Sequence, residues 1–214
     1  ENGTVECALV EIDVPEPAHN EVLVQIEAAP INPSDLGLMF GAADLSSARL
    51  AEREGQPALL LDVPTAAMRA MAPRIGHWMP VGNEGSGRVV AAGSHPDAKA
   101  FMGRRVGMFG GEMYAGYRCV PVEQCMPFSD AISAEQAASC FVNPMTALGF
   151  METRDIEGQK AIVHTAAASN LGQMLHRLCE ADDIPLVNIV RSDEQVALLK
   201  SLGADWVLNS GDAD

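Results

Sequence analysis

The sequence predicts an α/β protein in which a small, partly open β-barrel is followed by the first part of a doubly wound parallel sheet. Short segments of alternating apolar and polar residues, separated by glycine-rich corners, fill the first half of the chain. The second half follows a strand–helix–strand–helix–strand order. With 214 residues, of which 48% are hydrophobic, the chain can bury the core of one to two domains.

The first half is predicted to be rich in β-structure. Residues 7–14 (CALVEIDV) and 21–26 (EVLVQI) alternate apolar and polar side chains, as half-buried strands do. The same pattern continues in residues 87–92, 105–109 and 117–122. We therefore expect five short strands whose corners lie at glycines, as in a small barrel.

Residues 41–80 interrupt this pattern and are predicted to be a long insertion in the barrel. The segment is rich in Ala, Leu, Met and Arg, and residues 65–74 (TAAMRAMAPR) predict a short helix. Two roles stay open for it: a structural lid or packing arm, and a wall of a substrate site.

The periodicity changes from Ser133 onward. Residues 133–141 begin like a capped helix, and Pro144 lies in the first turn of a second helix over 143–153. Six elements are then expected: a buried strand at residues 160–165, a turn of small residues at 166–170, an amphipathic helix at 171–181, a strand at 185–190, a helix at 193–202 and a strand at 205–208. We place the boundary of the two domains between residues 130 and 131.

Composition excludes several classes of function. The sum of 14 Lys and Arg against 29 Asp and Glu gives a net charge of −15, which repels nucleic-acid phosphates and anionic membranes. No apolar run is long enough to span a bilayer. The five cysteines are scattered without a CxxC pair, which favours neither a disulfide framework nor a zinc knuckle. We expect a protein of the cytoplasm that acts on a small molecule.

Three motifs occur in order ahead of the second-half pattern: residues 31–35 (INPSD), 80–89 (PVGNEGSGRV) and 142–147 (VNPMTA). In this order and spacing the chain resembles the medium-chain dehydrogenase/reductase superfamily, in particular its zinc-free quinone oxidoreductase and 2-enoyl thioester reductase branches. The resemblance implies a GroES-like catalytic domain over residues 1–130. It also implies a truncated Rossmann domain for NADP over residues 131–214.

The resemblance also bears on metal. Zinc-containing members place Cys, His and Cys ligands at positions that correspond to Asn32, Asn83 and Val142, none of which is a good zinc ligand. We therefore predict no bound metal. Without a Lewis acid, hydride addition to an already electrophilic acceptor is easier than alcohol oxidation. The predicted function is reduction of quinones or of double bonds conjugated to a carbonyl.

The cofactor loop of the family corresponds to residues 166–172 (AAASNLG), which keep only the last glycine of the GxGxxG pattern. Small side chains still permit close approach of the backbone, and a helix N-terminus favours a pyrophosphate. The predicted cofactor-binding residues of this loop are Ala168, Ser169, Asn170, Leu171 and Gly172. A plain strand–helix turn is the alternative.

The end of the second strand of this half predicts the type of cofactor. NAD-binding proteins carry an acidic residue there, whereas this chain has Arg191 and Ser192. A cation and a hydroxyl donor suit a 2′-phosphate, so we predict NADPH. The alternative is an exposed Arg191 that pairs with Asp193 or Glu194.

The resemblance further assigns residues to the nicotinamide end of the cofactor. Asn32 and Thr146 are the predicted catalytic residues, and Asn143 is predicted to bind the cofactor. Asn143 is alternatively a helix cap and Asn32 a turn former. The tyrosine that donates a proton in enoyl thioester reductases is absent, with Ala43 in its place. Tyr114 and Tyr117 are expected to be structural. Quinone reduction, which can take its protons from solvent, is therefore more compatible with the missing tyrosine than enoyl thioester reduction is.

Two hypotheses remain open on sequence grounds. The first is an NADPH-dependent enzyme, and the second is a non-enzymatic descendant that keeps nucleotide binding or only the fold. Members of the family usually continue well beyond the third strand of the sheet, so we expect this sequence to be part of a longer polypeptide. A homodimer is the expected assembly, as is common in the family.

Overall fold

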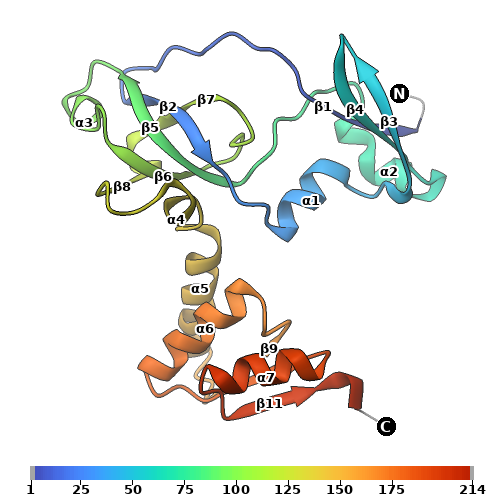
Figure 1. Cartoon of the computed structure of the whole chain (residues 1–214), viewed down its shortest axis with the longest axis vertical. Coiled ribbons are helices and arrows are strands. Elements are labelled where there is room, and N and C mark those ends of the chain that lie inside the picture. Colours follow the sequence, from blue (N-terminus) through green and yellow to red (C-terminus); the bar gives the residue numbers. More distant parts are fainter. Residues whose placement is uncertain (1–2, 213–214) are drawn as a thin grey trace. The chain divides into compact units, whose positions relative to one another are not determined.

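The computed structural model describes residues 3–212 and divides into two compact units, the first ending at Ser139 and the second beginning at Cys140. The elements of both units are labelled in Figure 1. We describe each unit by itself. The predicted functional domains, 1–130 and 131–214, stay a prediction.

A five-stranded antiparallel sheet with the order β7-β2-β5-β6-β8 forms the centre of the first unit (Figure 1). Its strands are β2 (Glu21–Ala28), β5 (Glu84–Ala92), β6 (Arg105–Phe109), β7 (Tyr117–Pro121) and β8 (Cys125–Phe128). The core contains the fully buried Val22, Val24, Val89, Val106, Met108 and Val120. Four of these strands are confirmed predictions, whereas β8 is too short, with Pro127 inside it, to show a pattern.

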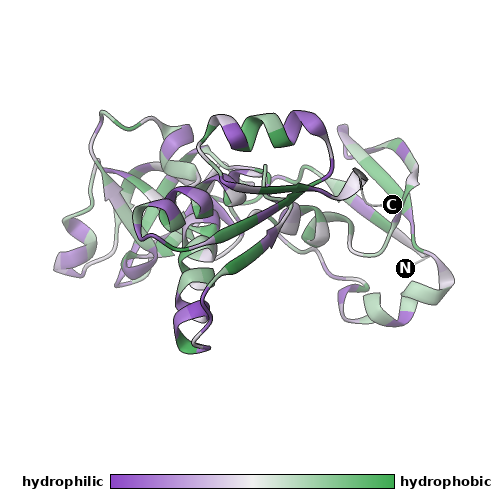
Figure 2. Ribbon diagram, turned by 90° about the horizontal axis from the view of Figure 1, so that it is seen from below, coloured by the Kyte–Doolittle hydropathy of each residue, from purple (hydrophilic) through white to green (hydrophobic). Residues whose placement is uncertain are grey.

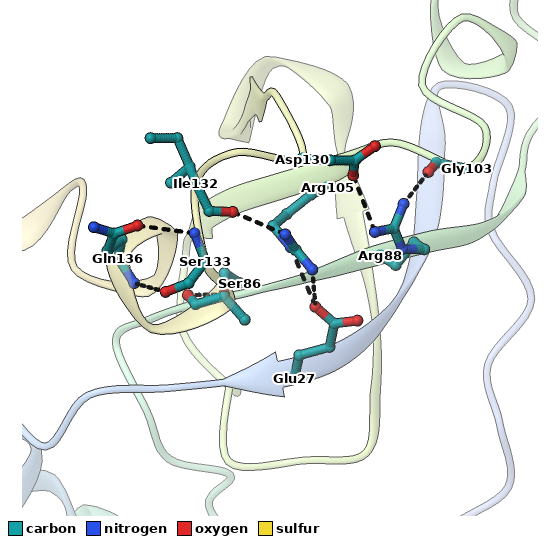
Figure 3. Close-up of polar contacts among 10 residues, drawn as sticks. Glu27, Ser86, Arg88, Gly103, Arg105, Asp130, Ile132, Ser133 and Gln136 are labelled. Carbon is teal, nitrogen blue, oxygen red and sulfur yellow. Dashed lines mark hydrogen bonds and ion pairs between the residues drawn. The ribbon is translucent and has the colours of Figure 1, made fainter.

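The helices α1 (Pro33–Phe40) and α3 (Pro96–Lys99) lie between strands of this sheet in the chain, and α4 (Ala134–Ala138) follows its last strand. Polar contacts hold the α4 segment on the sheet (Figure 3). Arg105 of β6 donates to the Ile132 carbonyl at 2.8 Å and pairs with Glu27 at 3.3 Å, and the Ser86 hydroxyl donates to the Ala134 carbonyl. Ser133 caps α4 by accepting from the Gln136 amide. These contacts explain why the first compact unit continues to Ser139.

A second sheet of the first unit has the order β1-β4-β3, with β1 (Thr4–Ala8), β3 (Asp44–Arg53) and β4 (Gln56–Asp62). The prediction of a strand over residues 7–14 is wrong in extent. The pairing of β1 with β4 ends where Ala8 lies opposite Ala58, near the start of β4, so the chain beyond has no partner strand. Leu9 and Ile12 are accordingly exposed.

The predicted insertion therefore contains the β3–β4 hairpin, which the sequence pattern does not indicate. The short helix predicted at residues 65–74 is confirmed as α2 (Met68–Met71) between two 3-10 turns. Gly41, where the insertion starts, has a positive φ, and the side chains of Met71 and Arg74 occupy the space of a Cβ there. Side chains near the end of the insertion thus pack against its first residue.

The second unit is built of alternating helices and strands. It contains α5 (Val142–Ile156), β9 (Ile162–Thr165), α6 (Asn170–Ala181), β10 (Leu186–Val190), α7 (Asp193–Ser201) and β11 (Trp206–Asn209). The three strands are parallel, in the order β11-β10-β9. The predicted apolar face of α6 is confirmed, because Leu175 and Cys179 are buried against Ile162 and Leu186.

The predicted α/β class is confirmed. Hydrophobic and hydrophilic residues alternate along the helices in Figure 2, as expected for helices that cover a core with one face. Within residues 3–212, no helix combines the length and the apolar character needed to cross a bilayer.

Candidate functional site

A buried polar cluster lies where α1 and β5 begin. Asn32, which precedes α1, and Asp35, in its first turn, are buried, as is Glu84 at the start of β5. The Asp35 carboxylate accepts the backbone N–H of Asn32 at 2.8 Å and that of Asn83 at 2.9 Å. The Asn32 side-chain amide donates to Glu84 at 3.0 Å. The two motifs that flank the insertion are therefore joined through Asp35 and Glu84.

Tyr114 adjoins this cluster. Its phenol donates to the Pro30 carbonyl at 2.9 Å, and its backbone N–H donates to the Val81 carbonyl at 3.0 Å. Burial raises the pKa of Tyr114 to about 12, with a further contribution from the charge of Asp35. The phenol is thus neutral and held in place at neutral pH.

The positions that correspond to zinc ligands are engaged otherwise. Asn32 is bonded to Glu84, and the Asn83 side chain donates to the Ser34 hydroxyl at 3.0 Å. In the part of the chain that the structure describes, no group of three or more His, Cys, Asp or Glu side chains is arranged to hold a metal ion. Metal independence stays a prediction.

A hollow of about 940 Å³ opens beside the cluster. Its walls come from β1, β4, the end of α1 and residues 63–79, and Val81 and Tyr114 also line it. Most of the lining is apolar. The insertion therefore forms one side of a cavity.

In the second unit, the turn between β9 and α6 has the features of a phosphate loop. Ser169 caps α6 by accepting from the Gly172 amide at 3.2 Å, and both Ser169 and Asn170 are exposed. A Cβ on Gly172 would lie 2.1 Å from the Ala167 carbonyl oxygen. Glycine at 172 therefore permits the close approach of α6 to the turn, which is the role of the last glycine in the family pattern. Ala168 and Leu171 are half-buried beside two core clusters.

The end of β10 carries the other predicted cofactor residues. Arg191 is exposed, and in residues 3–212 it forms no ion pair. Asp193 instead accepts from the Asn209 side chain at 2.9 Å, so the alternative in which it pairs with Arg191 is not observed. Ser192 caps α7 through the Gln195 amide. The arrangement leaves the Arg191 guanidinium available to an anion.

Asn143 and Thr146 lie in the first turns of α5. The cap of this helix is Phe141, so Asn143 is not its N-cap. The exposed Thr146 hydroxyl donates to the Val142 carbonyl at 2.6 Å, which commits its proton and leaves its lone pairs to accept. Asn32 belongs to the first unit, whereas every other predicted site residue belongs to the second.

Sequence reasoning missed the buried acids, whereas Tyr114, which it expected to be structural, donates to the Pro30 carbonyl. Asp35 and Glu84 lie inside the quoted motifs, and an acidic residue three positions after Asn32 is a typical capping signal. That signal could have identified Asp35. The sequence carries no such signal for the contact between Tyr114 and Pro30, because this contact depends on loop geometry that no local pattern shows.

The chain was compared with known proteins to test the resemblance that its three motifs indicate. No family model matches the chain. It is 30% identical over 205 residues to the mitochondrial enoyl-[acyl-carrier-protein] reductase of Caenorhabditis elegans, which covers 92% of this chain and 50% of that protein. A Mesorhizobium loti structure described as a NADPH:quinone reductase shares 34% identity with a TM-score of 0.70, over 94% of this chain and 52% of that one. The Escherichia coli quinone oxidoreductase complexed with NADPH has the same fold, with a TM-score of 0.67 at 23% identity, over 96% of this chain and 55% of that one.

These similarities confirm the resemblance drawn from the three motifs. Over nearly its whole length the chain is similar to quinone oxidoreductases and enoyl reductases of the medium-chain dehydrogenase/reductase superfamily. It spans about half the length of the curated relatives it matches.

Proposed function

We propose that this chain is the GroES-like domain and the first part of the Rossmann domain of an NADPH-dependent oxidoreductase. In this proposal the enzyme reduces quinones or double bonds conjugated to a carbonyl, by hydride transfer and without zinc. The observation that carries the proposal is a combination of two features of the second unit. The loop before α6 is exposed, and Arg191 forms no ion pair with a carboxylate of the described residues.

The residues of the second unit fit a phosphorylated dinucleotide. The N-terminus of the twelve-residue helix α6 offers backbone N–H groups and a partial positive charge to a pyrophosphate. Ser169 and Asn170 add side-chain donors there. Arg191 and Ser192 suit the 2′-phosphate that distinguishes NADPH from NADH. NADPH, when bound, supplies the hydride.

The first unit would handle the charge that develops on the acceptor. A reduced enone or quinone carries negative charge on oxygen, which needs hydrogen-bond donors. An asparagine amide has two N–H groups, and Asn32 commits one of them to Glu84. We assign the second to the acceptor oxygen. Asp35 and Glu84 keep the Asn32 backbone and side chain in place.

The neutral Tyr114 does not replace the missing family tyrosine in this scheme, since its proton is engaged by Pro30. Protons would then reach the product from solvent, which favours quinones over enones. A small-molecule substrate, a cytoplasmic location and a homodimer complete the proposal. The net charge of −15 supports the absence of a nucleic-acid partner.

The test is turnover by the intact protein. Loss of NADPH absorbance is followed with benzoquinone and with cyclohexenone, before and after treatment with a zinc chelator. We expect turnover of at least one acceptor and no effect of the chelator. Saturable NADPH binding without turnover on any quinone or enone would favour the non-enzymatic descendant, which the loss of two loop glycines supports. Absence of NADPH binding would contradict the enzyme and leave only a descendant that keeps the fold.

A further inference from the structure

A cavity smaller than the hollow of the first unit lies in the second unit, where β10 and β11 begin. Its volume is about 280 Å³, near the lower limit of roughly 300 Å³ for pockets of small ligands. Its walls come from the second half of α6, the turns that follow α6 and α7, and the first residues of β10 and β11. The predicted cofactor loop follows the end of β9, at the opposite edge of the parallel sheet. The cavity is therefore separate from the predicted cofactor site.

Two buried polar side chains line this cavity and offer hydrogen-bond acceptors. Asn188 of β10 is 1% exposed, and its Oδ1 has no partner within residues 3–212. His164, opposite Asn188 on β9, does not supply one, because its own Nε2 is also unpartnered there. His176 of α6 is 6% exposed and donates from Nε2 to the Leu202 carbonyl at 3.0 Å, which leaves Nδ1 of the neutral ring as an acceptor. A buried acceptor without a donor costs free energy, and a ligand that brings N–H groups would remove that cost.

Three carboxylates also line the cavity: those of Glu180, Asp183 and Asp205, all of them exposed residues. In the part of the chain that the structure describes, none of the three forms an ion pair. The cations Arg177 on α6 and Lys200 on α7 do not engage them either. The cavity therefore carries negative charge that no cation of residues 3–212 neutralises.

These features select among ligand classes. The negative charge repels an anion. Among the described residues no group of three or more His, Cys, Asp or Glu side chains is arranged to hold a metal ion, which disfavours a bare metal cation. A ligand that combines positive charge with N–H donors suits both the carboxylates and the buried acceptors. The remaining wall is partly apolar and can contact a short hydrocarbon chain: it includes Cys179, Ile184, Pro185 and Leu186.

We infer that this cavity binds a small alkylammonium ligand, in particular a short aliphatic diamine. One ammonium group donates to Asn188 and His176, and the other lies among the three carboxylates. The volume of about 280 Å³ equals that of roughly nine water molecules in the liquid, which accommodates a chain of about four carbons with its two amino groups. The inference does not depend on the proposed function, because none of these residues belongs to the predicted catalytic or cofactor-binding set.

The first experiment uses Trp206, which lines the cavity and is the single tryptophan in a Trp78→Phe variant of the intact protein. Its fluorescence is titrated at constant ionic strength with 1,4-diaminobutane, with tetramethylammonium and with Mg²⁺ alone. We expect saturable binding of the diamine. Tetramethylammonium, which has the charge but no N–H donor, should bind at least about tenfold more weakly. Equal affinities of the two organic cations, tighter binding of Mg²⁺, or the absence of saturation would each overturn the inference.

The second experiment compares neighbouring aspartates. Asp183 lines the cavity, whereas Asp182 is equally exposed and does not line it. Asp183 has a positive φ of 58°, a conformation that asparagine tolerates, so Asp183→Asn should fold as Asp182→Asn does. Asp183→Asn should weaken diamine binding by about two- to fivefold, the value of an exposed ion pair, and Asp182→Asn should leave it unchanged. An equal loss in both variants would assign the binding to general surface charge and contradict the site.

A third variant tests the buried acceptor. Asn188→Leu removes the unpartnered Oδ1 and should weaken diamine binding by at least about tenfold. The diamine should raise the urea midpoint of the parent, because it binds the folded state, and should not raise that of Asn188→Leu. Unchanged diamine affinity in Asn188→Leu would overturn the inference. If Asn188→Leu does not fold, the comparison of Asp183→Asn with Asp182→Asn decides.

Discussion

Substitution of Gly172 by alanine tests the close approach on which the predicted cofactor loop depends. A Cβ at this position would lie 2.1 Å from the Ala167 carbonyl oxygen and 2.5 Å from its carbon. Both contacts are to backbone, so no side-chain rotation can relieve them. The turn and α6 would have to separate by about 1 Å, which is the kind of overpacking that costs roughly 1–3 kcal/mol.

Two further effects modify that cost. Alanine has a better helix propensity than glycine by about 1 kcal/mol. A shift of α6 also weakens the Ser169 cap, whose bond to the Gly172 amide is worth about 1 kcal/mol. These two effects nearly cancel, so Gly172→Ala should destabilise the second unit by about 1–3 kcal/mol.

Gly149→Ala is the matched control. Gly149 lies within α5, and a Cβ there meets nothing within 4 Å. This variant should gain about 0.5–1 kcal/mol from helix propensity alone. Urea unfolding of the intact protein is followed by Trp206 fluorescence in a Trp78→Phe background, because Trp206 lies in the second unit. If Gly172→Ala unfolds at the same or a higher urea concentration than the parent, the close packing of α6 on the turn is refuted.

Three further predictions concern the first unit. Since the pKa of Tyr114 is raised to about 12 by burial and Asp35, the contribution of this side chain to stability should be constant below about pH 10 and be lost between there and about pH 12. The raised thiol pKa of Cys125 adds to the alkaline loss of stability, so Tyr114→Phe should make that loss smaller in alkaline unfolding curves, and an unchanged curve would speak against the assigned environment. Asp35→Asn leaves at least one of the Asn32 and Asn83 backbone amides without an acceptor. It should lower the free energy of unfolding by about 1–3 kcal/mol, measured in urea through Trp78 fluorescence. A loss below about 0.5 kcal/mol would contradict the buried cluster. Burial, with the charge of Glu123, raises the pKa of the Cys125 thiol to about 12. Iodoacetamide should therefore modify Cys125 slowly in the folded protein at neutral pH and readily in urea, as mapped by mass spectrometry. Fast labelling of the folded protein would refute the burial of this thiol.

The second unit could be predicted well from sequence because its signals are local. The spacing of Leu171, Leu175 and Cys179 defines one face of α6, and a single chain segment settles each strand and helix there. The first unit was harder. The alternation in residues 7–14 is real, but a strand needs a partner, and β4, which lies some fifty residues further on, ends its pairing at Ala8.

The candidate site divides in the same way. Ser169 and Gly172 follow from a local motif and Arg191 from its place at the end of a strand, and their roles stay predictions. The buried cluster joins residues near 32, 83 and 114, and these contacts depend on loop geometry that no periodicity encodes. The hollow has the same origin, because its walls come from β1, α1 and the insertion together.

The most direct test of the account is the discrimination between NADPH and NADH by the intact protein. Calorimetric titration compares the wild type, Arg191→Ala and Arg177→Ala, the last of which removes the same charge from an exposed position on α6. We predict that Arg191→Ala weakens NADPH binding by about ten- to hundredfold, the value of a charge-assisted hydrogen bond, and leaves NADH binding unchanged. Arg177→Ala should alter neither. Equal affinity of the wild type for both dinucleotides, or an equal loss in the two variants, would contradict the account.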